Sequence, residues 1–450
     1  MNEFDWGLYS QAEARLRGFL REFLEGPGDG REIAARIERG TSTDIFEWID
    51  HVRVPRARLD REALLREGFT ETEVTDVGGS GNFRVKGSTL FPLIPGGNAT
   101  LEVVLKTDDI ETFRRVHAPK SEIEGKRGAS VRRLRISETE GVALSAVERR
   151  GFGGFSSPGE DDVTEYSAVL RVMRARRRDF DTEREAFKSL DRFVERIQRD
   201  IESARLADAF FVAEREFWEL KNQAARVQRK RQDGLGLGWG NRDHHTFRSS
   251  RQGFAALTRI FERLGMKPRE RYHAGAQAGW GAQIMEHPES GEVVFADVDL
   301  GKDESRDDFA RGGLGDKKEL GTVGLWVALH GNSIFQAGMH HLAARFRFHD
   351  LTRDLGSKGI AMMKPFSDFP FLRQAFTAGE KWYPIPESAS GLAASAQISA
   401  EKAAEFRGSG AIGSHLENIQ RGQGFKGFNQ DSVSAIIKAT DPRTAGLRGA

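Results

Sequence analysis

The sequence predicts an α+β fold built from repeated strand–helix–strands units, with helical segments inserted at the N-terminus and in the centre of the chain. Period-two alternation, typical of half-buried strands, is followed by an amphipathic helix and then by further extended runs, and this order occurs in both halves. Between the halves, residues 164–232 carry apolar stripes at helical spacing, which indicate packed helices.

The clearest unit spans residues 241–300. An alternating segment at 241–248 predicts a strand, and the apolar positions within 254–264 have the spacing of an amphipathic helix. Extended runs at 280–286 and 292–300, separated by a turn-like segment, predict two more strands. The order is therefore strand, helix, strands.

The remaining segments extend this pattern. A strand at 46–54 precedes a helix at 60–67 and extended runs up to residue 106, so the N-terminal half repeats the same organisation. Residues 322–329 are predicted as an apolar strand, and the residues after Gly410 as a polar tail. We accordingly divide the chain into four parts: N-terminal helices with a degenerate copy of the unit pair at 1–160, a helical insert and linker at 161–240, the half that carries the candidate site at 241–390, and a C-terminal helix and tail at 391–450.

Composition excludes several classes of protein. The 450 residues contain 30 % charged residues that nearly cancel, at net charge +1, and the local basic runs lack interleaved aromatic residues, so no nucleic-acid partner is expected. The absence of cysteine excludes disulfides and thiolate ligands, which leaves nitrogen and oxygen to hold any metal. No apolar run approaches membrane-spanning length and no signal peptide is evident, so a cytoplasmic protein without a membrane partner is expected.

Two His-x-x-x-Arg segments are the main candidates for chemistry. Residues four apart on a strand share a face, so His244 and Arg248 are expected to project into one space. A neutral imidazole can bind a metal, and a guanidinium can hold a carboxylate. A surface histidine and a surface arginine are the plainer explanation of one such pair. His341 and Arg345 repeat the pattern at the start of another unit, which favours a functional role for both pairs.

These segments resemble the vicinal oxygen chelate superfamily, in which paired βαβββ modules form a cupped mixed sheet around a divalent metal. Residues 240–430 are more specifically similar to the 2-oxoadipate dioxygenase/decarboxylase family, also called hydroxyglutarate synthase. The matching segments are the His-x-x-x-Arg strand at 244–248, the helix and turn at 259–266, the second strand at 340–345, Leu-Arg-Gln at 372–374 and Ser-His-Leu at 414–416.

The resemblance implies two histidine ligands, His244 and His341, and one glutamate. Glu380 is the expected third ligand because it follows His341 within the same unit, although its Gly-Glu context reproduces only two letters of the family motif. Glu148 has a better local match but lies in the N-terminal half, where it would require a permuted site with His51. The choice between the two glutamates stays open at this point.

The implied activity is that of a non-haem Fe(II)-dependent dioxygenase, which decarboxylates and hydroxylates a small 2-oxo acid such as 2-oxoadipate. Two histidines and a carboxylate leave coordination positions free for such a substrate and for dioxygen. Arg248, Arg345 and Ser409 are the expected substrate-binding residues. The expected metal is Fe(II), with zinc, manganese or nickel as alternatives. The alternative functions are a glyoxalase-type isomerase or lyase with zinc or nickel, and a non-catalytic binding protein of the same fold. The oligomeric state is left open.

Overall fold

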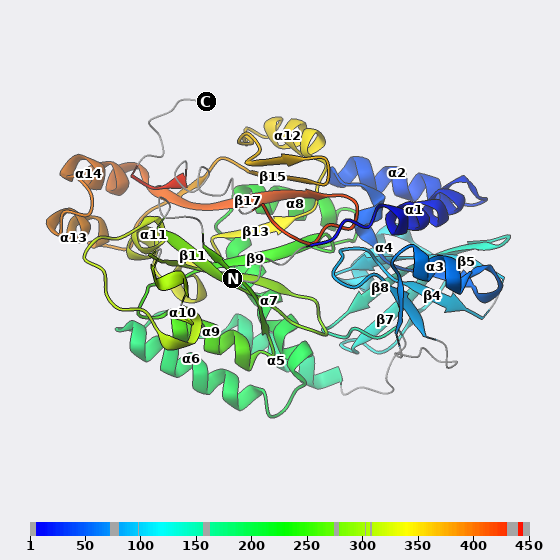
Figure 1. The fold of residues 1–450 in the computed structure, drawn as a ribbon, viewed down its shortest axis with the longest axis horizontal. Coiled ribbons are helices and arrows are strands. Elements are labelled where there is room, and N and C mark those ends of the chain that lie inside the picture. The colour runs from blue at the N-terminus through cyan, green and yellow to red at the C-terminus, as the bar shows by residue number, and fades with distance from the viewer. Residues whose placement is uncertain are drawn as a thin grey trace.

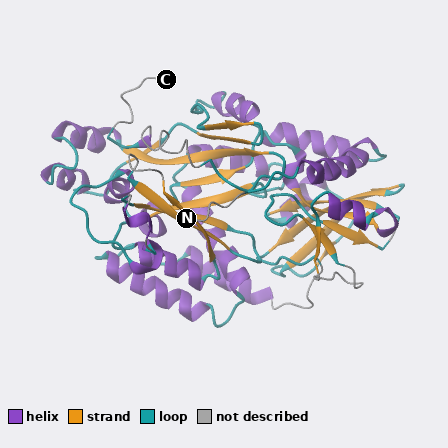
Figure 2. Cartoon of the chain, viewed as in Figure 1, coloured by secondary structure: helices purple, strands orange, loops and turns teal. Residues whose placement is uncertain are grey.

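The protein is built around two β-sheets with the same strand order, shown in Figures 1 and 2. The computed structural model describes residues 6–72, 81–97, 99–155, 163–273, 279–301, 303–306, 308–429 and 440–443. The first sheet comes from the N-terminal half and the second from the C-terminal half. This arrangement confirms the predicted α+β class.

The first sheet contains two βαβββ units joined by an antiparallel pair of central strands. In each unit the first and last strands pair in parallel, and a short helix, α3 (Arg61–Arg66) or α4 (Ile110–His117), follows the first strand. The strand order is β2 (Thr70–Thr72), β3 (Asn82–Arg84), β4 (Leu93–Gly96), β1 (Ile49–Pro55), β5 (Leu101–Thr107), β8 (Val142–Arg149), β7 (Val131–Thr139) and β6 (Ile123–Glu124).

The second sheet repeats this topology. Its short helices are α9 (Phe254–Arg263) and α12 (Phe348–Gly356), and its central strands are again antiparallel. The order is β10 (Lys267–His273), β11 (Trp280–Glu286), β12 (Val293–Asp299), β9 (Arg242–Arg248), β13 (His341–Ala344), β17 (Ala411–Arg421), β15 (Leu372–Phe376) and β14 (Ser367–Phe369), with β16 (Glu380–Trp382) paired to β17. Four βαβββ units in two pairs give the vicinal oxygen chelate arrangement.

Helices cover the outer faces of both sheets. The N-terminal helices are α1 (Ser10–Glu25) and α2 (Gly30–Thr41), and the central insert consists of α5 (Val163–Arg174), α6 (Glu183–Ile197), α7 (Ser203–Glu219) and α8 (Gln223–Asp233). On α7, Phe211 stacks on His245 with ring centroids 4.6 Å apart. Since α7 packs on the face that His245 occupies, the opposite face of β9 remains available for the site.

Two local predictions are wrong. The segment predicted as a strand is helix α11 (Thr322–His330), whose first N–H groups bond to the buried Asp299 carboxylate. A short run that is apolar all round carries no periodicity to separate a buried helix from a buried strand. Residues 411–421, the first part of the predicted polar tail, form β17, which follows α13 (Ser388–Ala394) and α14 (Ala400–Ser409). Within the described residues, no helix combines the length and apolar character needed to cross a membrane.

Candidate metal centre

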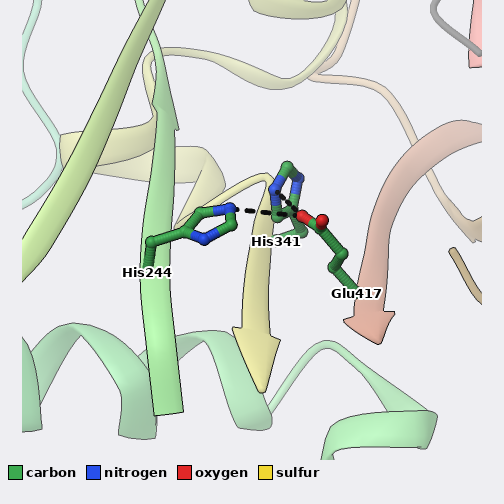
Figure 3. Close-up of side chains that lie close together, drawn as sticks. All are labelled: His244, His341 and Glu417. Atoms are coloured by element: carbon green, nitrogen blue, oxygen red, sulfur yellow. Dashed lines mark ion pairs between the residues drawn. The ribbon is translucent and has the colours of Figure 1, made fainter. Parts of the chain in front are cut away.

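Three side chains from three adjacent strands converge in the second sheet. His244 lies on β9, His341 on β13 and Glu417 on β17. Ala343 on β13 is paired with His244 on one side and with Glu417 on the other, and His341 lies two residues before it on the same face. Figure 3 shows the two imidazoles and the carboxylate pointing toward one another.

The ligand atoms of these side chains lie close enough to share one ion. Glu417 Oε2 is 3.2 Å from His244 Nε2 and 3.0 Å from His341 Nε2, and the ligand atoms of all three residues lie within 4.8 Å of one another. All three residues are buried. Two imidazole nitrogens and a carboxylate oxygen on one face form the donor set of a facial triad, so the residues fit a divalent transition metal.

Burial and the opposed charges set the protonation of the centre. Burial acts against the charged imidazolium of His244, but Glu417 and Asp243 outweigh it and raise the pKa of His244. Burial alone would likewise raise the pKa of Glu417, yet His244 and His341 hold that pKa well below its usual range. The pKa of His341 is lowered, chiefly by burial. The carboxylate is therefore ionised and ready to bind a cation.

The outer nitrogens of the two histidines have different partners. His244 Nδ1 lies 3.0 Å from Asp243 Oδ1, whereas His341 Nδ1 lies 3.0 Å from His340 Nδ1. These contacts direct both Nε2 atoms toward Glu417. The hydroxyl of Thr246 lies 2.8 Å from His341 Nε2, so metal binding would replace that hydrogen bond.

The centre lies in a cavity with several aromatic side chains in its wall. Arg248, an expected substrate-binding residue, also lines it and is 1 % exposed. Its Nε and Nη1 groups have no hydrogen-bond partner within the described residues, and Asp297 Oδ2 is 3.9 Å from Nε. The aromatic wall consists of Tyr272, Trp280, Phe295, Phe366, Phe376 and Phe428.

Arg345 and Ser409 lie outside this cavity. A register irregularity between Ala343 and Ala344 interrupts the alternation, and β13 ends at Ala344. Arg345 is consequently directed to Asp243 and Glu47, with both contacts at 3.0 Å. Ser409 ends α14, is exposed, and donates to a backbone carbonyl within its own helix. Neither residue can contact a ligand beside His244 in this arrangement.

The expected third ligand, Glu380, does not lie beside His244 and His341 in the structure. Glu380 lies on β16, and its Oε1 accepts hydrogen bonds from the N–H groups of Gln223 and Ala224 at the start of α8. This is the role of a carboxylate at a helix N-terminus. Glu417 takes the place beside the histidines. The alternation of His415, within the Ser-His-Leu segment, and Glu417, directly after it, was the sequence signal for a strand bearing a ligand.

The alternative ligands His51 and Glu148 lie in the first sheet. His51 is buried with its Nδ1 2.6 Å from Asp50 Oδ1, and burial lowers the pKa of His51 to about 4. Glu148 accepts a hydrogen bond from the N–H of Ile110. Neither belongs to a group of metal-ligating side chains among the residues that the structure places.

Strand register explains how the described residues of the first sheet differ from this centre. His51 and Ser145 flank Val104, just as the ligands of the second sheet flank Ala343. Glu102 lies two residues before Val104, at the position of the second histidine, and accepts a hydrogen bond from Ser145. The first sheet therefore keeps one histidine of the set, and a hydroxyl stands where the carboxylate ligand would be.

Exchange of the two candidate glutamates for glutamine tests the site directly. Because Glu417 supplies the only negative charge of the triad, Glu417→Gln should weaken Fe(II) or Mn(II) binding by more than about 100-fold, beyond the usual effect of an outer partner. The matched variant Glu380→Gln should bind the metal as wild type does. Titration of the metal-free protein measures both affinities. Equal losses in the two variants would contradict the assignment.

Asp297 predicts a pH effect on stability. Burial raises its pKa from 3.8 to about 7, against the opposing effect of Arg248. A carboxyl pKa raised by folding stabilises the fold at acidic pH, and this contribution is lost progressively as the pH rises from about 4 to about 7. In the metal-free protein, wild type should lose roughly 2–3 kcal/mol relative to Asp297→Asn between about pH 5 and about pH 8. Thermal midpoints of both proteins at each pH measure this, and a gap independent of pH would disprove it.

Comparison with known proteins gives only distant likenesses. No protein-family model and no curated protein matches the sequence. A mutant 4-hydroxymandelate synthase from Streptomyces coelicolor is 12 % identical over 88 % of this chain and 98 % of its own, with a TM-score of 0.30. A protein described as a hydrolase from Shewanella frigidimarina is 16 % identical over 49 % and 97 %, with a TM-score of 0.34. Methylmalonyl-CoA epimerase from Mycobacterium tuberculosis is 13 % identical over 41 % and 89 %, with a TM-score of 0.23. Because these sequence identities and TM-scores are low, the fold is assigned from the strand order of the two sheets.

Proposed function

We propose that this protein is a non-haem Fe(II)-dependent dioxygenase that acts on a small 2-oxo acid. The observation that carries the proposal is the buried His244–His341–Glu417 group in the same cavity as the buried Arg248. Two histidines and one carboxylate are the donor set of Fe(II) oxygenases, and no thiolate is available to favour another metal class. When bound, Fe(II) would supply adjacent open positions for a chelating 2-oxo acid and for dioxygen.

Arg248 defines the second requirement for the substrate. Burial lowers the pKa of this guanidinium to about 10, so it remains charged at neutral pH. A buried guanidinium with unpaired Nε and Nη1 groups costs several kcal/mol, and an anionic ligand would offset that cost. The planar fork binds a carboxylate in bidentate fashion, which favours a 2-oxo acid with a second carboxylate, such as 2-oxoadipate.

The overall reaction balances with dioxygen as the only oxidant. The bond between the keto carbon and the C1 carboxylate breaks and releases carbon dioxide. One oxygen atom enters the new carboxylate, and the other forms a hydroxyl on the shortened acid. The aromatic wall would exclude water from the reacting groups, and Arg248 would hold the distal carboxylate.

Oxygen uptake distinguishes this reaction from other chemistry on the same fold. Protein reconstituted anaerobically with Fe(II) should consume one dioxygen and release one carbon dioxide per molecule of 2-oxo acid, measured with an oxygen electrode and trapped labelled carbon dioxide. The zinc-loaded and nickel-loaded proteins should be inactive. Turnover without oxygen, supported by zinc or nickel, would instead establish an isomerase or lyase. A metal-loaded protein that turns over no 2-oxo acid would overturn the proposal.

Replacement of Arg248 should affect one class of substrate only. Arg248→Met removes charged hydrogen bonds worth about 1.5–3 kcal/mol, so KM for a 2-oxo dicarboxylate should rise about 10- to 150-fold. KM for a 2-oxo monocarboxylate should be nearly unchanged, because its carboxylate binds at the metal. Steady-state kinetics with both substrates gives the comparison. An equal rise for both would show that Arg248 does not bind the distal carboxylate.

A further inference from the structure

The Nδ1 atom of His244 contacts the carboxylate of Asp243, which two arginines hold in place. Asp243 Oδ1 lies 3.0 Å from His244 Nδ1, and Arg421 donates to Asp243 through Nε at 2.8 Å and Nη2 at 3.1 Å. Arg345 Nε donates to the same carboxylate at 3.0 Å. Arg421 and Arg345 together hold the Asp243 carboxylate in place behind the imidazole of His244.

This support extends into the first half of the protein. The second arm of Arg345 donates to Glu47 Oε2 at 3.0 Å, and Glu47 belongs to the short helical turn Ile45–Trp48 that precedes β1. A continuous series of contacts thus runs from Glu47 through Arg345 and Asp243 to His244. All four side chains are at most 17 % exposed, which limits screening by solvent.

The first sheet contains the same support without the metal-ligating set. Arg149 donates to Asp50 through Nε at 2.8 Å and Nη2 at 2.7 Å, and Asp50 contacts His51 Nδ1. Arg149 lies four residues after Ser145, as Arg421 lies four residues after Glu417. Both sheets therefore contain an arginine that binds an aspartate, which in turn contacts a histidine. The further contacts through Arg345 to Glu47 are observed only for the aspartate beside His244, among the described residues.

We propose that Asp243 is a positioning residue for the metal ligand His244, and that the N-terminal half braces it through Glu47 and Arg345. The inference rests on metal binding by the proposed triad. An aspartate that accepts from Nδ1 fixes the imidazole tautomer with Nε2 free for the metal and increases its basicity. His341 has the imidazole of His340 at this position in place of a carboxylate, so the two histidine ligands are predicted to contribute unequally to metal affinity.

The internal repeat provides a matched control for the test. Asp243→Asn and Asp50→Asn remove the same charge from the same arginine–histidine arrangement, so both should lower the thermal midpoint of the metal-free protein similarly. Of these two variants, Asp243→Asn alone should weaken Mn(II) binding, by about 10- to 100-fold. Glu47→Gln should weaken it by a smaller factor, and Asp50→Asn should bind as wild type does. Calorimetric titration of the full chain with Mn(II) measures the four affinities.

The outcomes separate this inference from the proposed function. If wild type binds Mn(II) and Asp243→Asn binds it within about threefold of wild type, the positioning role is refuted while the triad stands. Equal losses in Asp243→Asn and Asp50→Asn would refute it too, because a general loss of stability would then explain both. If Asp243→Asn does not fold, the test uses Glu47→Gln and Arg345→Lys. An unchanged affinity of both variants for Mn(II) would then refute the proposal that Glu47 and Arg345 brace Asp243. Wild type that binds no Mn(II), Fe(II) or Zn(II) would refute the proposed function itself.

Discussion

The register between β9, β13 and β17 is the constraint on which the candidate centre depends. Ala343 pairs with His244 on one side and Glu417 on the other, so a buried alanine separates the two outer ligands. A slip of one residue in either pairing would turn a ligand to the opposite face of the sheet, where the helical insert packs. The packing of Phe211 on His245 and of α9 against the same face helps to fix that register.

Buried charge is the second organising feature. Glu417 faces two imidazoles, Asp243 faces two guanidinium groups, and Arg248 lies beside Asp297 at a distance too long for a hydrogen bond. The negative charges of Glu417 and Asp243 each face positively charged or hydrogen-bonding partners at close range. Among the described residues, the positive charge of Arg248 has only the more distant carboxylate of Asp297 beside it. This difference separates the parts of the site that hold the structure from the part that would bind a ligand.

The sequence predicted part of this site for physical reasons. His244 and Arg248 share a face because β9 is a regular strand over their whole span. The same argument failed for Arg345, because β13 is short and its pairing is irregular at Ala344. Glu417 was missed because β17 carries buried polar residues at the site, and polar composition suggested an exposed tail. The repeated units were predicted, but the correspondence of His51 with His244 required the strand register.

The two halves illustrate how one architecture can be used twice with different results. Both sheets keep the arginine–aspartate–histidine support, and a phenylalanine ring packs edge-on against the histidine in each. In the second sheet, Glu417 supplies the anionic ligand for a cation, whereas the equivalent position in the first sheet is Ser145. The chain is thus expected to hold one metal ion of this kind.

Anomalous diffraction from anaerobic crystals loaded with Fe(II) tests the central claim most directly. We expect a single strong peak at the iron edge, bonded to His244 Nε2, His341 Nε2 and a Glu417 oxygen at about 2.0–2.2 Å. An iron peak beside Glu380 or His51 would contradict the claim. So would the absence of any peak in crystals grown from protein that binds stoichiometric iron in solution.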